Sequence, residues 1–353
     1  MKLLVSALEP SSNLHLKEVL KHTQDVELIG IFDKNIKEGT PLYDISEMAI
    51  MGVVDAVKKL HWFFKVADEI IELAKDKNVD KILLMDSSGF NLPLAKKLKT
   101  AYPDKEIIYY VLPQIWASRP KRAKKLEKYC DKLLGILPFE VDFYQSKARY
   151  IGHPLLDEIK VSHSPETDTI AFMPGSRKSE INRLLPIFKE VRKKLSDKKA
   201  ILIIPSSFSE EKITTLYGDI TEFEISKDTQ TALAQSEFAF ICSGTATLEA
   251  ALIGTPFTLS YIAKSVDFFI GTKLLGIEQV GLANIILTNY NNTTLHNEIL
   301  QEEVTVDNLL KEYYNTDRKI FADKAKELRK YLDHGSSENV AQIIMDRDDT
   351  NNF

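Results

Sequence analysis

The stretch FAFICSGTATLEAALIGTP (Phe238–Pro256) joins an apolar run to a helix-forming run through three small residues, Ser243-Gly244-Thr245. A short apolar run bounded by turn residues is typical of a buried strand in a parallel sheet. A strand that turns straight into a helix presents free backbone N–H groups at the helix N-terminus. Those groups and the helix dipole favour an anion such as phosphate. The stretch therefore predicts a strand–helix unit with an anion site at its turn.

The same alternation extends over most of the 353 residues. Strands are expected at 2–8, 27–32, 80–86, 106–112 and 132–137, and again at 169–174, 199–205, 222–226, 237–243 and 257–262. Helices are expected at Ser12–Lys21, Asp55–Asp76, Leu92–Ala101, Glu180–Leu195, Thr245–Leu252, Arg318–Asp333 and Ser337–Asp346. Because nearly continuous apolar strands alternate with helices, the sheets should be parallel and covered on both faces.

A polar segment that contains a proline, Val161–Asp168, separates the two series of strands. Single cores stop growing near ~250–300 residues, so two domains are expected. The expected ranges are 1–160, 161–317 and a C-terminal helical segment, 318–353, that packs back on the first domain. Ligands of such sheets bind beyond the carboxyl ends of the strands. The predicted fold is α/β, with two Rossmann-like, doubly wound domains that face a central cleft.

The composition narrows the class of protein. A hydrophobic content of 44% and a charged content of 27% are ordinary for a soluble globular protein, and the apolar runs are too short to span a bilayer. Glu9 and Pro10 interrupt the first apolar run, which favours a strand over a signal peptide. Two cysteines, Cys130 and Cys242, favour a reducing cytoplasm. No dinucleotide glycine pattern or His/Cys cluster occurs, so we expect no cofactor, no metal and no nucleic acid partner.

The side chains of the opening stretch suit a nucleoside diphosphate. Gly244 allows close backbone approach to an anion, and hydroxyl donors are available at Ser243, Thr245 and Thr247. The carboxylate of Glu249 would accept hydrogen bonds from two ribose hydroxyls. The alternative is helix capping alone, with Thr245 as the N-cap and Glu249 as a first-turn acid.

Two other strand ends carry polar residues. In AFMPGSRKSEINR, the turn Gly175-Ser176 precedes a helix, and Arg177 offers a fork of donors to a phosphate or a developing anion. In LLMDSSGFNLP, Asp86 could deprotonate an attacking hydroxyl. The alternatives are a solvated arginine and an ordinary turn aspartate with Ser87, Ser88 and Asn91.

Two surface features suit a lipid substrate. The segment SRPKRAKKLEK (Ser118–Lys128) has six basic residues and one acidic residue, which suits phosphates or an anionic membrane, or else a solvated helix face. The segment Met48–Ile70 is apolar beyond one helical stripe, which suits lipid or acyl contacts, or else the core. His153, in YIGHPLLD, fits either a site or a structural role.

Several motifs together resemble the lipid-A-disaccharide synthase family in order and spacing, from about Ile45 to Val304. They are ISEMAIMGVVDAV, DSSGFN, LPQIWASRPKRAKKLEKYCDKLLGILPFE, YIGHPLLD, MPGSRKSEI, CSGTATLEAALIGTP and LQEEVT. The resemblance implies a GT-B glycosyltransferase that needs no metal and binds its donor nucleotide in the second domain. UDP-2,3-diacylglucosamine would donate its sugar to 2,3-diacylglucosamine 1-phosphate, giving the β-1′,6-linked disaccharide 1-phosphate and UDP. The enzyme would be peripheral on the cytoplasmic face of the inner membrane. The sequence leaves open whether it forms a homo-oligomer.

The resemblance also implies roles for individual residues. Asp86 would be the catalytic base, and Arg177 would steady the leaving diphosphate. The predicted substrate-binding residues are Ser243, Gly244, Thr245, Thr247, Glu249, Gly175, Ser176, Asn284, Glu9, Ser11, Asn91 and His153. The residues predicted to face the membrane or the acceptor phosphate are Arg119, Lys121, Arg122, Lys124 and Lys125.

The chain departs from the family pattern on the acceptor side. Its opening loop is ALEPSSN where the family has A-G-E-x-S-G-D, so Asn13 stands in the place of an acid. Gly89 replaces the second aspartate of D-x-P-D-F-N, and Ser118 replaces the second tryptophan of W-A-W. The alternatives are therefore a UDP-sugar transferase with a different lipid acceptor, a UDP-N-acetylglucosamine epimerase, and a non-catalytic UDP-sugar-binding paralogue.

Overall fold

The computed structural model describes residues 1–51, 56–263 and 279–346, with the side chains of 49–60 and 167 left out. The chain divides into two compact units, which are treated separately below. Unit 1 comprises Met1–Glu158 and the chain from His334 onward, and unit 2 comprises Ile159–Asp333.

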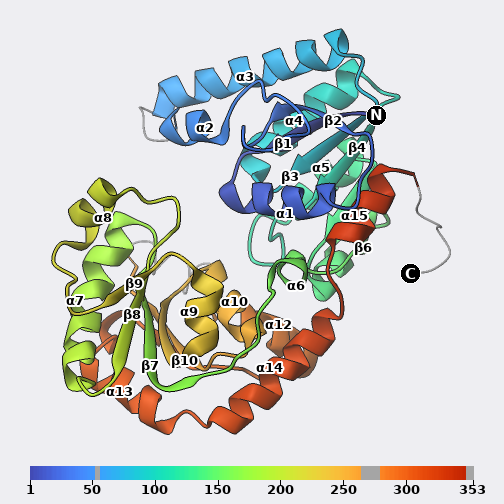
Figure 1. Ribbon diagram of the computed structural model, residues 1–353. Coiled ribbons are helices and arrows are strands. Elements are labelled where there is room, and N and C mark those ends of the chain that lie inside the picture. Colours follow the sequence, from blue (N-terminus) through green and yellow to red (C-terminus); the bar gives the residue numbers. More distant parts are fainter. Residues whose placement is uncertain (52–55, 264–278, 347–353) are drawn as a thin grey trace. The chain divides into compact units, whose positions relative to one another are not determined.

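Unit 1 is built on a parallel six-stranded sheet of order β2-β1-β3-β4-β5-β6 (Figure 1). Its strands are β1 (Lys2–Ala7), β2 (Glu27–Ile31), β3 (Lys81–Met85), β4 (Glu106–Tyr110), β5 (Lys132–Gly135) and β6 (Ala148–Tyr150). Its helices are α1 (Pro10–Leu20), α2 (Ile45–Met51), α3 (Ala56–Asp76), α4 (Ser88–Ala101), α5 (Lys121–Tyr129), α6 (Pro154–Glu158) and α15 (Ser337–Ile344), with a 3₁₀ turn at Pro138–Phe143.

Side chains of one strand alternate between the two faces of the unit 1 sheet. Ile82 and Leu84 of β3 lie in a core with apolar residues of α3, α4 and α5, whereas Leu83 and Met85 lie in a core with residues of α1 and α15. Helices therefore cover both faces, as Figure 1 shows. This double cover explains why the strands read as continuous apolar runs.

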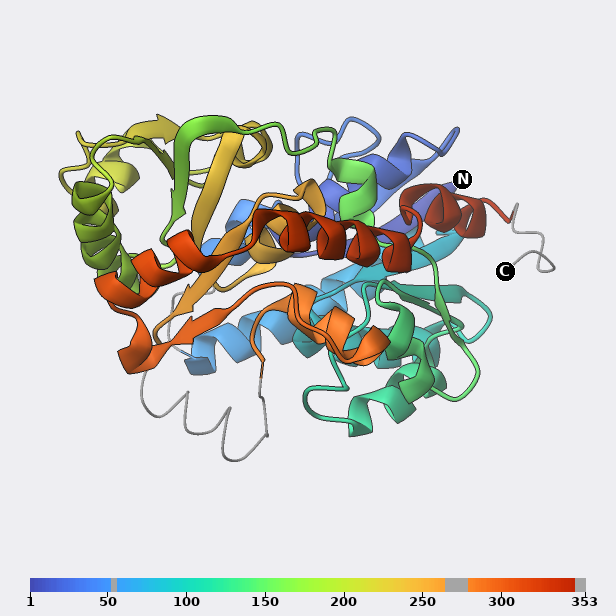
Figure 2. The same cartoon turned by 90° about the horizontal axis from the view of Figure 1, so that it is seen from below.

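Unit 2 repeats this plan with a parallel sheet of order β12-β11-β10-β7-β8-β9. Its strands are β7 (Glu166–Met173), β8 (Lys199–Ile203), β9 (Glu224–Ser226), β10 (Ser236–Cys242), β11 (Phe257–Tyr261) and β12 (Glu298–Leu300). Its helices are α7 (Lys178–Lys194), α8 (Glu210–Tyr217), α9 (Thr229–Gln235), α10 (Thr245–Ile253), α12 (Leu282–Asn291), α13 (Val306–Asn315) and α14 (Arg318–Leu332), with a 3₁₀ turn at Gln301–Glu303. The two helices α13 and α14 follow one another in orange-red in Figure 2.

The core of unit 2 is rich in phenylalanine. Phe172 of β7 stacks on Phe240 of β10 with ring centroids 5.3 Å apart, and Phe188 of α7 packs on both. Such aromatic contacts add to the free energy gained by burial. On the other face, Phe257 of β11 contacts Phe321 of α14 edge-on. The two central strands, β7 and β10, are thereby held side by side, and the turns that follow them lie at one edge of the sheet.

Every strand expected from the sequence is present, and two short edge strands, β6 and β12, were missed. The expected domain boundaries were 160 and 317, whereas the chain enters unit 2 at Ile159 and returns to unit 1 at His334. Accordingly α14 packs on α10 and α12 within unit 2, and α15 packs on α1 within unit 1. Among the described residues, no helix combines the length and the apolar character needed to cross a bilayer.

Candidate active site

The turn between β10 and α10 leaves a helix N-terminus open. Gly244 is the N-cap and carries no side chain that could accept from the first-turn N–H groups, and no capping side-chain hydrogen bond forms there. A Cβ built on Gly244 would meet nothing within 4 Å, and both Gly244 and Thr245 are exposed. Open backbone N–H groups at a helix N-terminus make an anion site. This geometry fits the anion predicted for the turn.

Other residues of this segment have less simple roles. The capping alternative named Thr245 as the N-cap, but Thr245 is the first helical residue. The predicted hydroxyl donor Thr247 is buried and donates to the carbonyl of Gly244 at 2.7 Å, so it closes the first turn of its own helix. Ser243 is half-buried beside the carbonyl of Val280. Glu249 is half-buried one turn further along α10, beyond the first turn.

In the turn between β7 and α7, the backbone N–H groups are hydrogen-bonded to an acidic residue of α7 itself. Glu180 accepts from the backbone N–H groups of Ser176 and Arg177, both at 3.1 Å, and from the Arg177 guanidinium at 2.7 Å. Gly175 has a φ of +106°, and a Cβ there would lie 2.6 Å from a Glu180 oxygen. The amides of Ser176 and Arg177 are therefore bound by the carboxylate of Glu180, and the substrate-binding role of Gly175 and Ser176 stays a prediction.

Arg177 itself stays accessible. Its side chain is 77% exposed, and the pairing with Glu180 raises the pKa of the guanidinium, so the group is always charged. The pair is exposed only on the arginine side, because the side chain of Glu180 is 9% exposed. If the guanidinium moved away, Glu180 would keep its two backbone N–H partners.

Asn284 was predicted to bind substrate, but the structure uses its amide internally. Its Nδ2 donates to the His296 carbonyl and to Glu298, and its Oδ1 accepts from the N–H groups of Leu295 and His296. These bonds use the whole hydrogen-bonding capacity of an asparagine side chain. Glu298 also accepts from the backbone of Val280 and Gly281 at the start of α12. Asn284 therefore braces α12 against β12, and its predicted role in substrate binding stays a prediction.

In unit 1, two acidic residues follow neighbouring strands. β1 pairs with β3 so that Ala7 lies opposite Met85, and Glu9 and Asp86 come just after these residues. Ser87 donates its hydroxyl to Glu9 at 3.2 Å. Asp86 and Ser87 have φ values of 49° and 39°, a region that non-glycine residues seldom adopt.

The surroundings of Asp86 favour a proton acceptor. Its backbone is fixed because its N–H donates to the Tyr110 carbonyl at 3.0 Å and its carbonyl accepts from the Tyr109 hydroxyl at 2.5 Å. Burial raises the pKa of the Asp86 carboxyl, the backbone N–H of Ser87 lowers it, and the charge of Glu9 raises it. A carboxylate with a raised pKa is a better general base than a solvated one.

Three further predicted residues of unit 1 differ in their surroundings. Asn91 is fully buried, donates to the carbonyls of Met85 and Asp86, and accepts from Ser6, so it braces β1 and β3, and its predicted substrate role stays a prediction. Ser11 is exposed in the first turn of α1. His153 is buried with an unpartnered Nε2, and burial lowers its pKa to about 3. His153 is therefore a neutral, buried imidazole at neutral pH.

The basic segment forms α5, and its residues separate into two groups. Lys121, Lys124 and Lys125 are exposed, as is Arg119 in the preceding turn. Arg122 instead donates to Ser88 at 2.7 Å, at the start of α4. In the apolar segment before it, Phe64 is 49% exposed, while Met48 and Val66 are core residues and the side chains between 49 and 60 lie outside the described ones.

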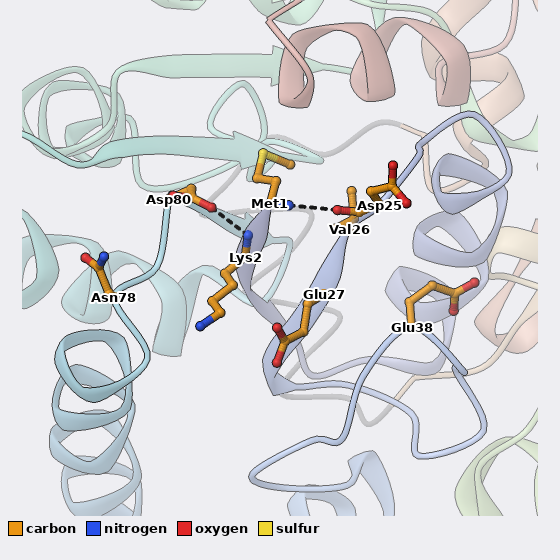
Figure 3. A pocket seen from close by; sticks show the side chains of 8 residues that line it. All are labelled: Met1, Lys2, Asp25, Val26, Glu27, Glu38, Asn78 and Asp80. Atoms are coloured by element: carbon orange, nitrogen blue, oxygen red, sulfur yellow. Dashed lines mark hydrogen bonds between the residues drawn. The ribbon is translucent and has the colours of Figure 1, made fainter.

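A pocket of about 520 Å³ lies elsewhere in unit 1 (Figure 3). It is lined by Met1, Lys2, Asp25, Val26, Glu27, Glu38, Asn78 and Asp80. These residues lie around the amino ends of β1 and β2, whereas Asp86 follows the carboxyl end of β3. The pocket is thus no part of the candidate site. No group of three or more His, Cys, Asp or Glu residues within the described ranges is placed to hold a metal ion.

The fold is shared with solved structures, among them a glycosyltransferase. The chain aligns with the calicheamicin glycosyltransferase CalG4 at a TM-score of 0.62, with 11% identity and coverage of 98% of this chain and 97% of the other. It aligns with the S. aureus MnaA–UDP co-structure at a TM-score of 0.61, with 12% identity and coverage of 98% and 96%. The chain therefore has the GT-B fold, because it has two Rossmann-like units and aligns over nearly its full length with structures of that class.

Sequence comparison narrows the class to one family. The family described as lipid-A-disaccharide synthetase matches residues 3–346. The lipid-A-disaccharide synthase of Helicobacter pylori (strain G27) is 49% identical over 96% of each chain, and that of Campylobacter jejuni (strain RM1221) is 45% identical over 97% of this chain and 98% of the other. The chain belongs to the lipid-A-disaccharide synthetase family, and it is a glycosyltransferase of lipid A biosynthesis.

Proposed function

We propose that the protein transfers the sugar of UDP-2,3-diacylglucosamine to the 6-hydroxyl of 2,3-diacylglucosamine 1-phosphate. The products would be the β-1′,6-linked disaccharide 1-phosphate and UDP. The observation that carries the proposal is the open N-terminus of α10 in a chain of this family, with no capping side chain and open space at Gly244.

Unit 2 would hold the donor. The N–H groups at the start of α10 would bind the diphosphate, since a helix N-terminus favours anions. The carboxylate of Glu249, half-buried on the same helix, would accept from the ribose hydroxyls. The exposed guanidinium of Arg177 would leave Glu180 for the diphosphate and stabilise the charge that develops on the leaving group.

Unit 1 would supply the base. As the acceptor oxygen forms its bond to the anomeric carbon, the bond between that carbon and the diphosphate oxygen breaks, and UDP carries away the electron pair. The proton of the attacking hydroxyl passes to the carboxylate of Asp86. Attack opposite the leaving group inverts the anomeric centre, and no covalent intermediate with the protein is needed. Catalysis would come from positioning, the base and fixed positive charge.

The acylated substrates suit a membrane surface. The exposed residues Arg119, Lys121, Lys124 and Lys125 would contact anionic headgroups or the acceptor phosphate, each worth about 1 kcal/mol near such a surface. We infer a cytoplasmic protein, peripheral on the inner membrane. Reversing Lys121, Lys124 and Lys125 to Glu should abolish sedimentation with anionic vesicles but leave UDP affinity intact. Unchanged sedimentation would contradict the inference.

The reaction is tested with purified protein and both acylated substrates in detergent. Mass spectrometry should detect a disaccharide 1-phosphate together with UDP release. Asp86→Asn should lower turnover about 10²–10⁴-fold, and Arg177→Ala about 10²–10³-fold, while Asp86→Asn keeps the parent affinity for UDP. UDP release that needs no acceptor would overturn the proposal in favour of epimerisation. UDP binding without any product would identify a different acceptor or a non-catalytic protein.

A further inference from the structure

The basic helix α5 carries one cation whose surroundings differ from those of its neighbours. Lys121, Lys124 and Lys125 are exposed, whereas Arg122 is half-buried. Arg122 lies one helical turn before Leu126, which is fully buried in a core that also contains residues of α4. Residues four apart share one face of a helix. Arg122 therefore lies on the face of α5 that packs against α4, and the three lysines lie outside it.

A hydrogen bond places the guanidinium of Arg122 beside the turn that carries the proposed base. Its Nη1 donates to the hydroxyl of Ser88 at 2.7 Å, and Ser88 is the first residue of α4, two positions after Asp86. The backbone of this turn is fixed, because the Asp86 N–H donates to the Tyr110 carbonyl at 3.0 Å. The structure thus holds a positive charge and the proposed base on one short stretch of chain.

The charge of Arg122 has no carboxylate partner within the described ranges of the chain. Its bond to Ser88 uses one of the five N–H donors of a guanidinium. By contrast, the guanidinium of Arg177 in unit 2 is paired with Glu180. A charge that is removed from water without a counter-ion is costly. An anion that enters beside Ser88 would supply the missing partner.

The chain leaves room for a ligand beside Ser88. The next residue, Gly89, is exposed, and a Cβ built on it would meet nothing within 4 Å. The first turn of α4 contains no acidic residue that could occupy the guanidinium or repel an anion. The planar fork of an arginine matches the oxygens of a phosphate, which it binds through two parallel hydrogen bonds. A phosphate group is therefore the ligand that this arrangement suits.

The chemistry of the proposed acceptor matches this spacing. Its phosphate is attached to C1, and its reactive 6-hydroxyl is carried by C5 through C6. Because C1 and C5 flank the ring oxygen, the hydroxyl and the phosphate lie along the same edge of the sugar. An acceptor whose 6-hydroxyl reaches Asp86 must therefore have its phosphate within one sugar ring of that carboxylate. Arg122, held at Ser88, is a cation on the same turn.

We propose that Arg122, positioned by Ser88, binds the 1-phosphate of the acceptor and makes the enzyme select a phosphorylated acceptor over an unphosphorylated one. The proposal rests on the function proposed above and adds to it the residue that decides this selection. It leaves the exposed lysines of α5 to the membrane surface. Phosphate groups also occur in the donor and in membrane lipids, so the test separates these three sources.

The test compares two acceptors in neutral detergent without added lipid: 2,3-diacylglucosamine 1-phosphate and the same sugar without the phosphate. Arg122→Gln should lower kcat/KM for the phosphorylated acceptor by about 10- to 100-fold, mainly through KM. The value for the unphosphorylated acceptor and the KM of the donor should stay at the parent level. If the unphosphorylated sugar is turned over too slowly, its inhibition constant against the phosphorylated acceptor replaces kcat/KM.

Three further variants serve as controls. Lys96→Gln removes an exposed positive charge from α4 and should match the parent with both acceptors. Arg122→Lys keeps the charge but loses the planar fork, so its loss should be smaller than that of Arg122→Gln. Ser88→Ala releases the guanidinium and should raise the KM of the phosphorylated acceptor by less than Arg122→Gln does, with kcat unchanged. The melting temperature of each variant reports on folding.

Four outcomes would overturn the proposal. An equal loss with both acceptors would show that Arg122 only braces α5 against α4. A raised donor KM with an unchanged preference between acceptors would place the donor diphosphate at Arg122. Lost sedimentation with anionic vesicles, again with an unchanged preference, would assign Arg122 to lipid headgroups. If Arg122→Gln does not fold, Arg122→Lys and Ser88→Ala decide, and an unchanged preference in both overturns the proposal. Absence of product from the parent protein with either acceptor would instead refute the proposed function.

Discussion

The two sheets are built alike, but their carboxyl edges carry opposite chemistry. In unit 1, the turns after β1 and β3 present the carboxylates of Glu9 and Asp86. In unit 2, the turns after β7 and β10 present the guanidinium of Arg177 and the open N-terminus of α10. Parallel doubly wound sheets place ligands at this edge. The two edges therefore differ in charge: carboxylates follow the strands of unit 1, whereas a guanidinium and an uncapped helix N-terminus follow those of unit 2.

A finer contrast exists within unit 2. The helices α7 and α10 both follow central strands, but only α7 is capped by an acid of its own first turn, Glu180. At α10 the cap is a glycine with open space around it. One N-terminus is closed by a carboxylate of its own helix, and the other has no capping side chain.

The largest expected effect comes from closing the open terminus. Thr245→Asp places a carboxylate at the first residue of α10, where it favours the helix dipole but repels a phosphate. UDP affinity, measured by calorimetry, should fall about 100-fold, or about 2.7 kcal/mol, without loss of thermal stability. The matched variant Thr245→Asn is uncharged and should stay within a fewfold of the parent. Equal affinities for the two variants would contradict an anion site at α10.

A smaller effect tests a feature that both units share, a buried neutral histidine. Burial lowers the pKa of His153 in unit 1 to about 3 and that of His296 in unit 2 to about 4, from an unfolded value near 6.5. Since the unfolded chain takes up protons first, the stability from each residue is present above pH 6.5 and is lost as the pH falls below it. Each should cost about 1.4 kcal/mol per pH unit, or about 2 kcal/mol at pH 5.

The measurement is hydrogen exchange of amides in each unit between pH 6.5 and 5. His153→Gln should flatten the pH dependence of opening in unit 1, and His296→Gln should flatten it in unit 2. The slope is the readout, because either substitution also changes packing. Slopes parallel to the parent in both variants would refute the assignment.

The smallest effect concerns the closed terminus. Glu180→Ala removes the acceptor for two backbone N–H groups and should lower the free energy of unfolding by about 1 kcal/mol. Glu180→Gln keeps one oxygen acceptor for the backbone N–H groups and loses the ion pair with the exposed Arg177 side chain, so it should cost less. UDP affinity should hold or rise in both, because Arg177 is released. A large loss of UDP affinity in Glu180→Gln would show that Glu180 serves the ligand and not only the helix.

Local pattern predicted much of the fold because burial on two sheet faces leaves continuous apolar strands in the sequence. The misses, β6 and β12, are three-residue edge strands, too short to show a period. The sequence analysis also missed that Glu180 caps α7. The N-cap residue of α7 is Arg177, whereas the usual sequence signal of such a cap is a serine or threonine at that position.

Some predicted site residues could not be judged from the sequence. A buried asparagine and a ligand-binding one look the same in a sequence, so Asn91 and Asn284 needed the structure to show that their amides are satisfied internally. The hydrogen bond between His15 and Glu158 has no local signal in the sequence, because the two residues meet only when α1 and α6 pack.

Residue order alone was enough to reveal the parallel α/β plan, the strand-end turns and the family resemblance. These follow from short-range rules: the side-chain period of strands and helices, and the residues that a turn tolerates. The tertiary structure decided which polar groups stay open. Whether an amide, a carboxylate or a guanidinium can bind a ligand depends on the partners that folding brings within hydrogen-bond distance. Those partners, such as Glu298 for Asn284, lie on other elements of the chain.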